Sequence, residues 1–293
     1  MPSKGTNHVA LAAAFLALGI FTWVWWKTNL WYRQELVTGQ RAHIAAELAP
    51  YGNVLSVAIN GKLAILNGLK AFVEPHLSEP AFAAEFERFA AGLYAATTGV
   101  RVITIAPRAI PRYVYPLSGN ESIIGHDPMR DPRPDVRADV ERAVHSREIT
   151  LSGPNELRPG GLGLVARLAV RKGKTFWGVV TIALDLENLL RDSGLRPGPA
   201  DLKLALRARS GSIFFGDRTV FDLEPVVYRV ELPEGFWELA AIPRSGWNAS
   251  IREPLAVFNG AAVIIIASLT LLVYLGVNRE ARLLAEVKNR TTE

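Results

Sequence analysis

Two long uncharged runs, at residues 9–26 and 255–277, lie near the two ends of the chain. A membrane-spanning helix needs about 20 apolar residues, and both runs reach or approach that length. Large aromatic residues at the end of the first run, among them Trp23 and Trp26, stand where a signal-peptide cleavage site would need small residues. Such rings are typical of the belt at a membrane interface. We therefore predict transmembrane helices at 9–26 and 255–277, the first of them an uncleaved anchor.

Between Trp31 and Phe72, apolar residues recur at intervals of mostly three or four, which is the period of a helix with one apolar face. This pattern predicts a stalk helix region at 28–76, and Pro50 is expected to bend or break it. The apolar stripe fits a dimer seam and packing against the chain's own domain equally well. It consists of Ile44, Leu48, Tyr51, Leu55, Ile59, Leu66, Leu69 and Val73.

The rest of the central segment alternates between helical and strand patterns. Helices are predicted from Pro80 to about Ala96, with Ser78 as cap, from Pro134 to about His145, and at 186–192. Short alternating segments predict strands at 100–106, 113–115, near Thr150, and at 162–170, 176–184, 201–208, 212–215, 226–232 and 237–242. This order of elements predicts an α+β fold built on antiparallel sheets.

Composition and charge exclude several classes of function. The chain has no cysteine, which removes thiol nucleophiles, Cys-ligated zinc and iron–sulfur clusters. The formal charge is +5, but no block of Lys and Arg long enough to bind phosphates occurs, so nucleic acid is not an expected partner. The five histidines lack metal-ligand spacing. We therefore expect no enzyme activity, no metal and no cofactor.

Two polar features are interpreted as structural. Residues 160–163 read Gly-Gly-Leu-Gly, but they lack the lysine of a P-loop and precede a strand, so a tight turn with positive φ is expected there. Asp139 and Glu141 lie on the polar face of a predicted helix and are expected to be solvated. Lys and Arg counts near the two spans are equal on both sides, so the positive-inside rule gives no orientation.

A series of turn motifs in the central segment resembles the CHASE sensory domain, an extracytoplasmic input module of bacterial sensor kinases and diguanylate cyclases and of plant cytokinin receptors. The matching motifs are Tyr-Pro-Leu-Ser-Gly-Asn-Glu at 115–121, Ile-Gly-His-Asp at 124–127, Leu-Ser-Gly-Pro at 151–154, Gly-Gly-Leu-Gly-Leu at 160–164 and Phe-Trp-Gly-Val-Val at 176–180. The resemblance extends over roughly residues 40–250.

The resemblance implies a long stalk helix carrying two PAS-like antiparallel-sheet units between the two transmembrane helices. The implied divisions are a tail at 1–8, a span at 9–26, the stalk at 28–76, a membrane-distal sensor unit at 77–194, a membrane-proximal unit at 200–250, a span at 255–277 and a tail at 278–293. The central domain would be periplasmic, on the inner membrane, with both termini cytoplasmic.

The resemblance also implies a small-ligand pocket in the membrane-distal unit. In the plant receptors the ligand is held by an acidic residue before a helix and by the following strand, and the matching positions here are Asp135 and Ser152. Leu151 and Leu164 would form apolar walls, and Tyr115 could border the pocket or belong to its turn structure.

These implications lead to one expected function and two alternatives. The expected function is a membrane-anchored periplasmic sensor that binds a small-molecule ligand and signals across the lipid bilayer, as a homodimer or through a partner kinase or cyclase. Only about sixteen residues follow the second span, so the expectation includes no output domain of its own. The alternatives are a membrane-anchored solute-binding or scaffold protein without signalling, and a truncated remnant of a sensor kinase or diguanylate cyclase.

Overall fold

The computed structural model describes residues 4–75 and 82–291, so the predicted helix cap at Ser78 and the predicted start at Pro80 lie outside the described residues. The chain divides into two compact units. One unit combines the first part of the long helix α1 (Lys4–Leu63) with α6 (Trp247–Ser250) and α7 (Arg252–Thr291). The other unit is Ile44–Arg244 and contains both sheets.

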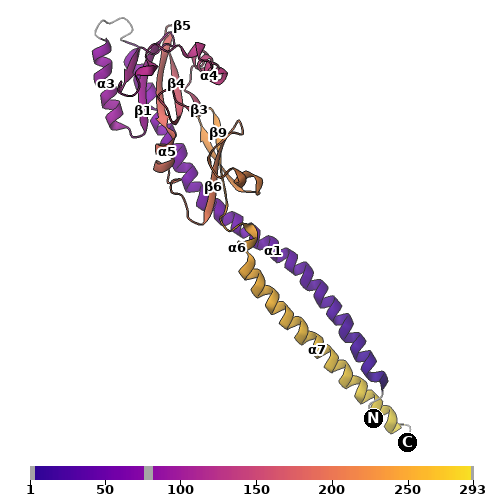
Figure 1. Ribbon diagram of the computed structural model, residues 1–293. Helices are drawn as coiled ribbons and strands as arrows, with labels where there is room; N and C mark the ends of the chain where they lie inside the picture. Colours follow the sequence, from indigo (N-terminus) through magenta and orange to yellow (C-terminus); the bar gives the residue numbers. More distant parts are fainter. Residues whose placement is uncertain (1–3, 76–81, 292–293) are drawn as a thin grey trace. The chain divides into compact units, whose positions relative to one another are not determined.

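In the first unit, α1 runs beside α7 (Figure 1), and side-chain contacts join the two helices. Trp25 Nε1 donates a hydrogen bond to Asn259 Oδ1 at 3.3 Å, and the Asn29 amide donates to the same oxygen. Tyr32 packs against Phe258 with ring centroids 4.7 Å apart. Two helical stretches of the described chain, His8–Val73 and Arg252–Leu284, are long and apolar enough to cross a membrane.

Pro50 does not end the helix, contrary to the expectation of a bend or break there. Helix α1 continues through Pro50 to Leu63, and a turn at Ala64 separates it from α2 (Ile65–Val73). Proline removes one backbone N–H, which leaves the carbonyl of Ala46 without its helical donor. Both residues are exposed, so water can hydrate that carbonyl.

The larger sheet of the second unit has five antiparallel strands in the order β2-β1-β5-β4-β3. Its strands are β1 (Val100–Pro107), β2 (Tyr113–Tyr115), β3 (Thr150–Glu156), β4 (Leu162–Lys172) and β5 (Thr175–Asp185). Strands β4 and β5, both predicted, pair as an antiparallel hairpin. The turn before β4 has positive φ at Gly160 and Gly161, which confirms the interpretation of that glycine-rich segment as a tight turn.

The two faces of this sheet contact different elements, because successive side chains of a strand point to opposite faces. α2 packs on β4 and β5, and α3 (Phe82–Ala96) packs on β1 and β2. α4 (Pro134–His145) contacts β3, β4 and β5. Figure 1 shows α3 and α4 on opposite sides of the sheet. α5 (Leu186–Asp192) follows β5 with the predicted bounds, and the Asp185 side chain caps it by accepting a hydrogen bond from the Asn188 backbone N–H.

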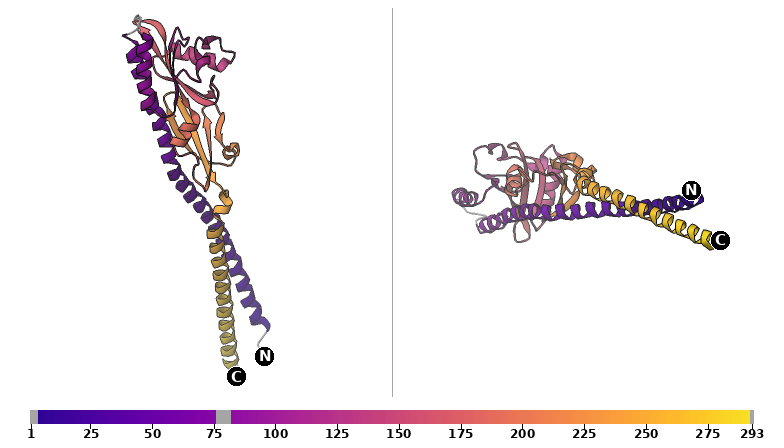
Figure 2. Two further views of the ribbon diagram at one scale, coloured as in Figure 1. Left: turned by 60° about the vertical axis from the view of Figure 1, so that its left-hand side comes forward. Right: turned by 90° about the horizontal axis from the view of Figure 1, so that it is seen from below.

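The apolar stripe of the stalk is buried against the chain's own domain. Leu48, Leu55, Ile59, Leu66 and Leu69 are fully inaccessible to solvent within this single chain. Figure 2 shows this part of the helices running beside the sheets. The stripe was compatible with a dimer seam or with packing against the chain's own domain, and the structure shows the second.

The smaller sheet has four antiparallel strands in the order β7-β6-β9-β8. Its strands are β6 (Leu202–Ala208), β7 (Ile213–Gly216), β8 (Val226–Leu232) and β9 (Gly235–Pro243). Short 3₁₀ turns complete the unit at Glu121–Ile123, Pro128–Arg130 and Arg218–Asp222. The predicted fold class is confirmed: a long N-terminal helix, two antiparallel sheets and two candidate membrane helices.

Candidate ligand-binding site

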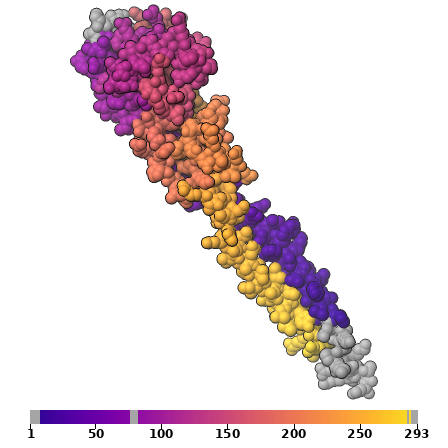
Figure 3. Space-filling model, in the orientation of Figure 1, coloured from indigo at the N-terminus to yellow at the C-terminus, as the bar shows by residue number. Residues whose placement is uncertain are grey.

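A cavity of about 130 Å³ lies on the α4 face of the five-stranded sheet. β1, β5, β4 and β3 form its floor, and α4 with the segment 109–133 encloses it from the other side. Figure 3 shows this segment, in magenta, on the outer surface of the domain on the face in view. The cavity is therefore covered by a long connection that has few regular elements of its own.

The cavity floor consists of rows of side chains that cross the strands. One row is apolar: Val102 of β1 faces Ala183 of β5, which faces Val165 of β4. The next row toward the β4–β5 turn is polar, with Thr104, Thr181 and Arg167 in the corresponding positions. A further apolar row follows, with Ala106 opposite Val179. Across β1, β5 and β4, these three rows are thus apolar except for the middle one.

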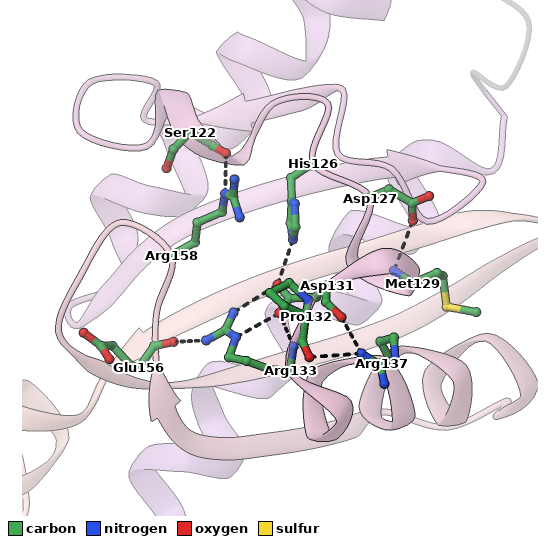
Figure 4. Close-up of polar contacts among 10 residues, drawn as sticks. All are labelled: Ser122, His126, Asp127, Met129, Asp131, Pro132, Arg133, Arg137, Glu156 and Arg158. Carbon is green, nitrogen blue, oxygen red and sulfur yellow. Dashed lines mark hydrogen bonds and ion pairs between the residues drawn. The ribbon is translucent and has the colours of Figure 1, made fainter.

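Two arginines tie the covering segment to the loop after β3 (Figure 4). Arg133 donates to the backbone oxygen of Glu156 at 2.9 Å, and Arg158 donates to the backbone oxygen of Ser122 at 2.8 Å. Each bond joins residues more than twenty positions apart in the chain. Opening the cavity on this side would require these bonds to break.

Asp131 organises the covering segment and is almost inaccessible to solvent. Its carboxylate accepts hydrogen bonds from the Arg133 side chain at 2.9 Å and from the Arg133 backbone N–H at 3.0 Å, and His126 Nε2 lies 3.0 Å from it. The hydrogen bond from the Arg133 guanidinium holds the pKa of the Asp131 carboxyl well below its usual range, although burial opposes this shift. Asp131 is therefore a charged anchor of the cover.

Arg167 presents a cationic group in the cavity floor. Its Nη1 donates to Ser152 Oγ at 3.1 Å. Burial lowers the pKa of Arg167 to about 10; the negative charge of Asp139 opposes that shift and the positive charge of Arg142 adds to it. The guanidinium therefore stays protonated at neutral pH, in surroundings that disfavour its charge.

Asp139 is only partly solvated, with 17% of its side chain exposed, contrary to the sequence-based expectation of a solvated residue. It lines the cavity, and its carboxylate accepts a hydrogen bond from Arg142 at 2.9 Å. Arg142 also donates to Glu234 Oε1 at 3.2 Å, in the turn between β8 and β9. Helical periodicity correctly predicts that Asp139 lies on the polar side of α4. In the structure, that side borders the cavity as well as solvent.

The structure brings only one of the five predicted ligand residues to this cavity. Ser152 lines it. Asp135 is exposed in the first turn of α4. Leu151 borders a separate cavity of about 520 Å³ next to Glu234 and Trp237.

Leu164 and Tyr115 lie on the other face of the sheet. Leu164 is fully buried opposite Leu184, and Tyr115 packs against Tyr94 of α3. Leu151 and Ser152 both border the cavity of about 520 Å³, whereas only Ser152 also lines the cavity under α4. Whether any of these five residues binds a ligand stays a prediction.

Comparison with known families identifies the segment that carries the cavity. Residues 85–213 match the family model described as the CHASE domain. This segment is a CHASE domain. It includes most of α3, the whole five-stranded sheet with its cavity and the first strand of the smaller sheet, β6. No curated protein sequence matches the chain.

Solved structures similar to the CHASE domain and its surroundings are sensor domains. The ligand-binding domain of the Pseudomonas fluorescens chemoreceptor CtaA, in complex with L-isoleucine, has a TM-score of 0.52 at 14% identity, covering 74% of this chain and 96% of that one. The corresponding domain of the Pseudomonas aeruginosa PAO1 chemoreceptor PctC, in complex with GABA, has a TM-score of 0.50 at 15% identity, covering 69% and 98%. At identities this low, the structural similarity shows a common fold alone.

A third solved structure is longer than the region it shares with this chain. It is an extracellular ligand binding receptor from Desulfohalobium retbaense DSM5692, with 13% identity and a TM-score of 0.49. The match covers 70% of this chain and 39% of the receptor.

Sequence reasoning missed the residues that give the cavity of the CHASE domain its polar character. Arg167 is the one charged residue in the run from Leu164 to Val170, and such a residue in a buried strand is a usable signal. Thr104 and Thr181 interrupt apolar strands in the same way. Their alignment in one row depends on strand register, which the sequence does not specify.

Proposed function

We propose that this protein is a membrane-anchored sensor whose CHASE domain binds a small ligand in the cavity under α4 and transmits the binding event to the membrane helices. The observation that carries the proposal is the enclosed cavity, with one polar row on an apolar floor, inside the segment that matches the sensory family. Binding sites for small molecules typically have this character: concave, mostly apolar and with few polar groups.

Membrane anchoring is supported by the exposure of the two apolar helices. Stretches of α1 and α7 with mean hydropathy 2.0 and 2.4 are almost entirely exposed within the single chain, unlike the core helices of a soluble domain. Trp23, Trp26 and Trp31 are each more than half exposed. We propose that the chain lies in the inner membrane, with the CHASE domain in the periplasm and both termini in the cytoplasm.

A route from the cavity to α1 passes through the smaller sheet. Asp139 at the cavity contacts Arg142, and Arg142 contacts Glu234 in the β8–β9 turn. Strand β8 in turn contacts α1: Tyr228 donates its hydroxyl to Asn53 Oδ1 at 2.6 Å. A ligand that binds one arrangement of α4 better than another would shift this series of contacts.

We also propose that a second copy of the chain, or a partner kinase or cyclase, receives the signal. The outward side of α1 in the second unit carries exposed apolar side chains, Val54 and Val57, and its exposed residues between Pro50 and Gly61 are all uncharged. Because the chain has no cysteine, Val57→Cys introduces a single thiol. Oxidative cross-linking in membranes should give a dimer, whereas the control Arg218→Cys on the smaller sheet should not.

The proposed function is tested by filling the cavity. Ala183 lies on the cavity floor, and Ala183→Leu should remove ligand binding without unfolding the domain. The control Ala138→Leu introduces the same leucine side chain at an exposed position of α4. The full chain in nanodiscs is screened by thermal shift against small metabolites, and each compound that raises the melting temperature is repeated with both variants.

The screen separates the proposal from its alternatives. Compounds that stabilise the native chain and Ala138→Leu, but not Ala183→Leu, support a ligand site in this cavity. Stabilisation that Ala183→Leu leaves unchanged contradicts it. Binding without any change in a spin label placed at the end of α7 would indicate a solute-binding protein that does not signal.

A further inference from the structure

The polar row on the cavity floor contains a cation without a matching anion. In the described part of the chain, the side chain of Arg167 makes one hydrogen bond, to the neutral hydroxyl of Ser152, and no carboxylate lies within 4.0 Å of it. Most of the N–H donors of this guanidinium are therefore free to bind a group in the cavity.

Two of the three acidic residues that line the cavity are already paired with other cations, and the third, Glu156, is exposed to solvent. Asp139, whose charge acts most strongly on Arg167, accepts its hydrogen bond from Arg142. Asp131 pairs with Arg133 and His126. Charged groups placed away from water are usually paired, because desolvating a lone charge is costly. The missing partner of Arg167 is thus an anion from outside the chain.

Two hydroxyl groups stand beside Arg167 on the same face. Thr181 is its direct cross-strand neighbour, and Thr104 is the neighbour of Thr181. Directly opposed residues have Cβ atoms about 5 Å apart. A carboxylate bound to the guanidinium can therefore also accept a hydrogen bond from Thr181.

The apolar rows on either side determine what else the ligand carries. Val102, Ala183 and Val165 lie on one side of the polar row, and Ala106 and Val179 lie on the other. An inorganic anion would leave both rows without a contact. A ligand with a short apolar portion would cover at least one of them.

We propose that the cavity binds a small organic anion, with its carboxylate held by Arg167 and Thr181 and its apolar portion on the flanking rows. This inference rests on the proposed function, since it names the class of ligand for the same cavity. Arg–carboxylate pairs are frequently bidentate, so the cavity should strongly prefer a carboxylate over the neutral amide of the same shape.

The test compares acids with their amides on the full chain in nanodiscs. The probes are isovalerate and isovaleramide, succinate and succinamide, and inorganic phosphate, and binding is measured by calorimetry and thermal shift. The variants are Arg167→Gln, which removes the charge, and Thr181→Val, which removes the hydroxyl at nearly constant shape. The control Arg218→Gln removes the same charge at an exposed position outside the cavity.

The proposal predicts that at least one carboxylate binds, that its amide binds about tenfold or more weakly, and that Arg167→Gln lowers its affinity by about tenfold to a hundredfold. Thr181→Val should weaken binding by less, and Arg218→Gln should leave it unchanged. Equal binding of acid and amide, unchanged affinity of Arg167→Gln, or binding of phosphate alone overturns the proposal. If only neutral compounds bind, the sensor function stands and this inference fails. If no compound of either kind binds, the proposed function is contradicted as well.

Discussion

Glu234 accepts a hydrogen bond from the backbone N–H of Leu151 at 2.9 Å, and this bond joins the turn of the smaller sheet to a strand of the larger one. Leu151 directly precedes Ser152, which lines the cavity. The other carboxylate oxygen of Glu234 accepts from Arg142 of α4. One side chain thus contacts α4 and β3, two of the elements that border the cavity, and connects the smaller sheet to the larger one.

Removing this carboxylate should loosen the connection. We expect Glu234→Ala to lower the free energy of unfolding by about 1 kcal/mol, because two hydrogen bonds to a partly exposed charge are lost. Urea denaturation of the full chain in detergent measures the change. The control Glu148→Ala removes an exposed carboxylate elsewhere in the domain and should stay within about 0.5 kcal/mol of the native value. Equal effects of both substitutions would contradict the bridging role.

The contact between α1 and strand β8 depends on a glycine. A Cβ atom added at Gly52 would overlap the ring of Tyr228, whereas one added at Gly61 of the same helix would meet nothing within 4 Å. We expect Gly52→Ala to destabilise the chain by about 1–3 kcal/mol through overpacking. Gly61→Ala should be neutral or stabilising by up to about 1 kcal/mol, since alanine favours helix. Thermal denaturation of both variants compares their stabilities. Similar effects would show that the Tyr228 ring moves aside without measurable cost, contrary to the prediction.

The unpaired charge in the cavity floor should cost stability when no ligand is bound. Arg167→Met keeps an unbranched apolar side chain and removes the charge, so we expect the free energy of unfolding to rise by about 1 kcal/mol or more. The same substitution should abolish stabilisation by a bound carboxylate. Arg218→Met, at an exposed site, should change neither quantity. A loss of stability in Arg167→Met equal to that of a core truncation would indicate a structural role for the arginine.

Acid should destabilise the cover of the cavity through Asp131. The folded-state pKa of this carboxyl is depressed, mainly by its hydrogen bond from Arg133. Its contribution is therefore complete above the unfolded pKa of about 3.9 and is lost as the pH falls toward the depressed folded value. Asp131→Asn should be less stable than the native chain at pH 7, and its stability should vary less with pH below about 4. Denaturation curves between about pH 2 and about pH 7 measure both slopes, and parallel slopes would contradict the assignment.

Periodicity predicted most of the fold because burial imposes it. The stripe from Ile44 to Val73 follows directly from which side chains face the core, whereas β1 is buried on both faces. Pro50 was misleading because an exposed helix tolerates the loss of one hydrogen bond. The local tendency of proline to end a helix is therefore outweighed by the packing of the whole helix.

The cavity was less accessible to sequence reasoning than the fold. Ser152 was identified by family resemblance, while Arg167, Thr181 and Thr104 become neighbours only through the register of three strands. Asp139 was assigned to solvent because helical periodicity does not distinguish a polar cavity from water. The glycine-rich motifs predicted turns correctly, because Gly160 and Gly161 adopt the positive φ that favours glycine.

The most direct test of the account is hydrogen–deuterium exchange on the full chain in nanodiscs, with and without the carboxylate that binds best. Ligand in the cavity should slow exchange in β3, β4 and α4, which border Arg167, and also change exchange in the β8–β9 turn at Glu234. Arg167→Gln should show neither effect at the same ligand concentration. Protection confined to other parts of the chain, or no protection at a saturating concentration, would contradict a ligand-sensing cavity in the CHASE domain.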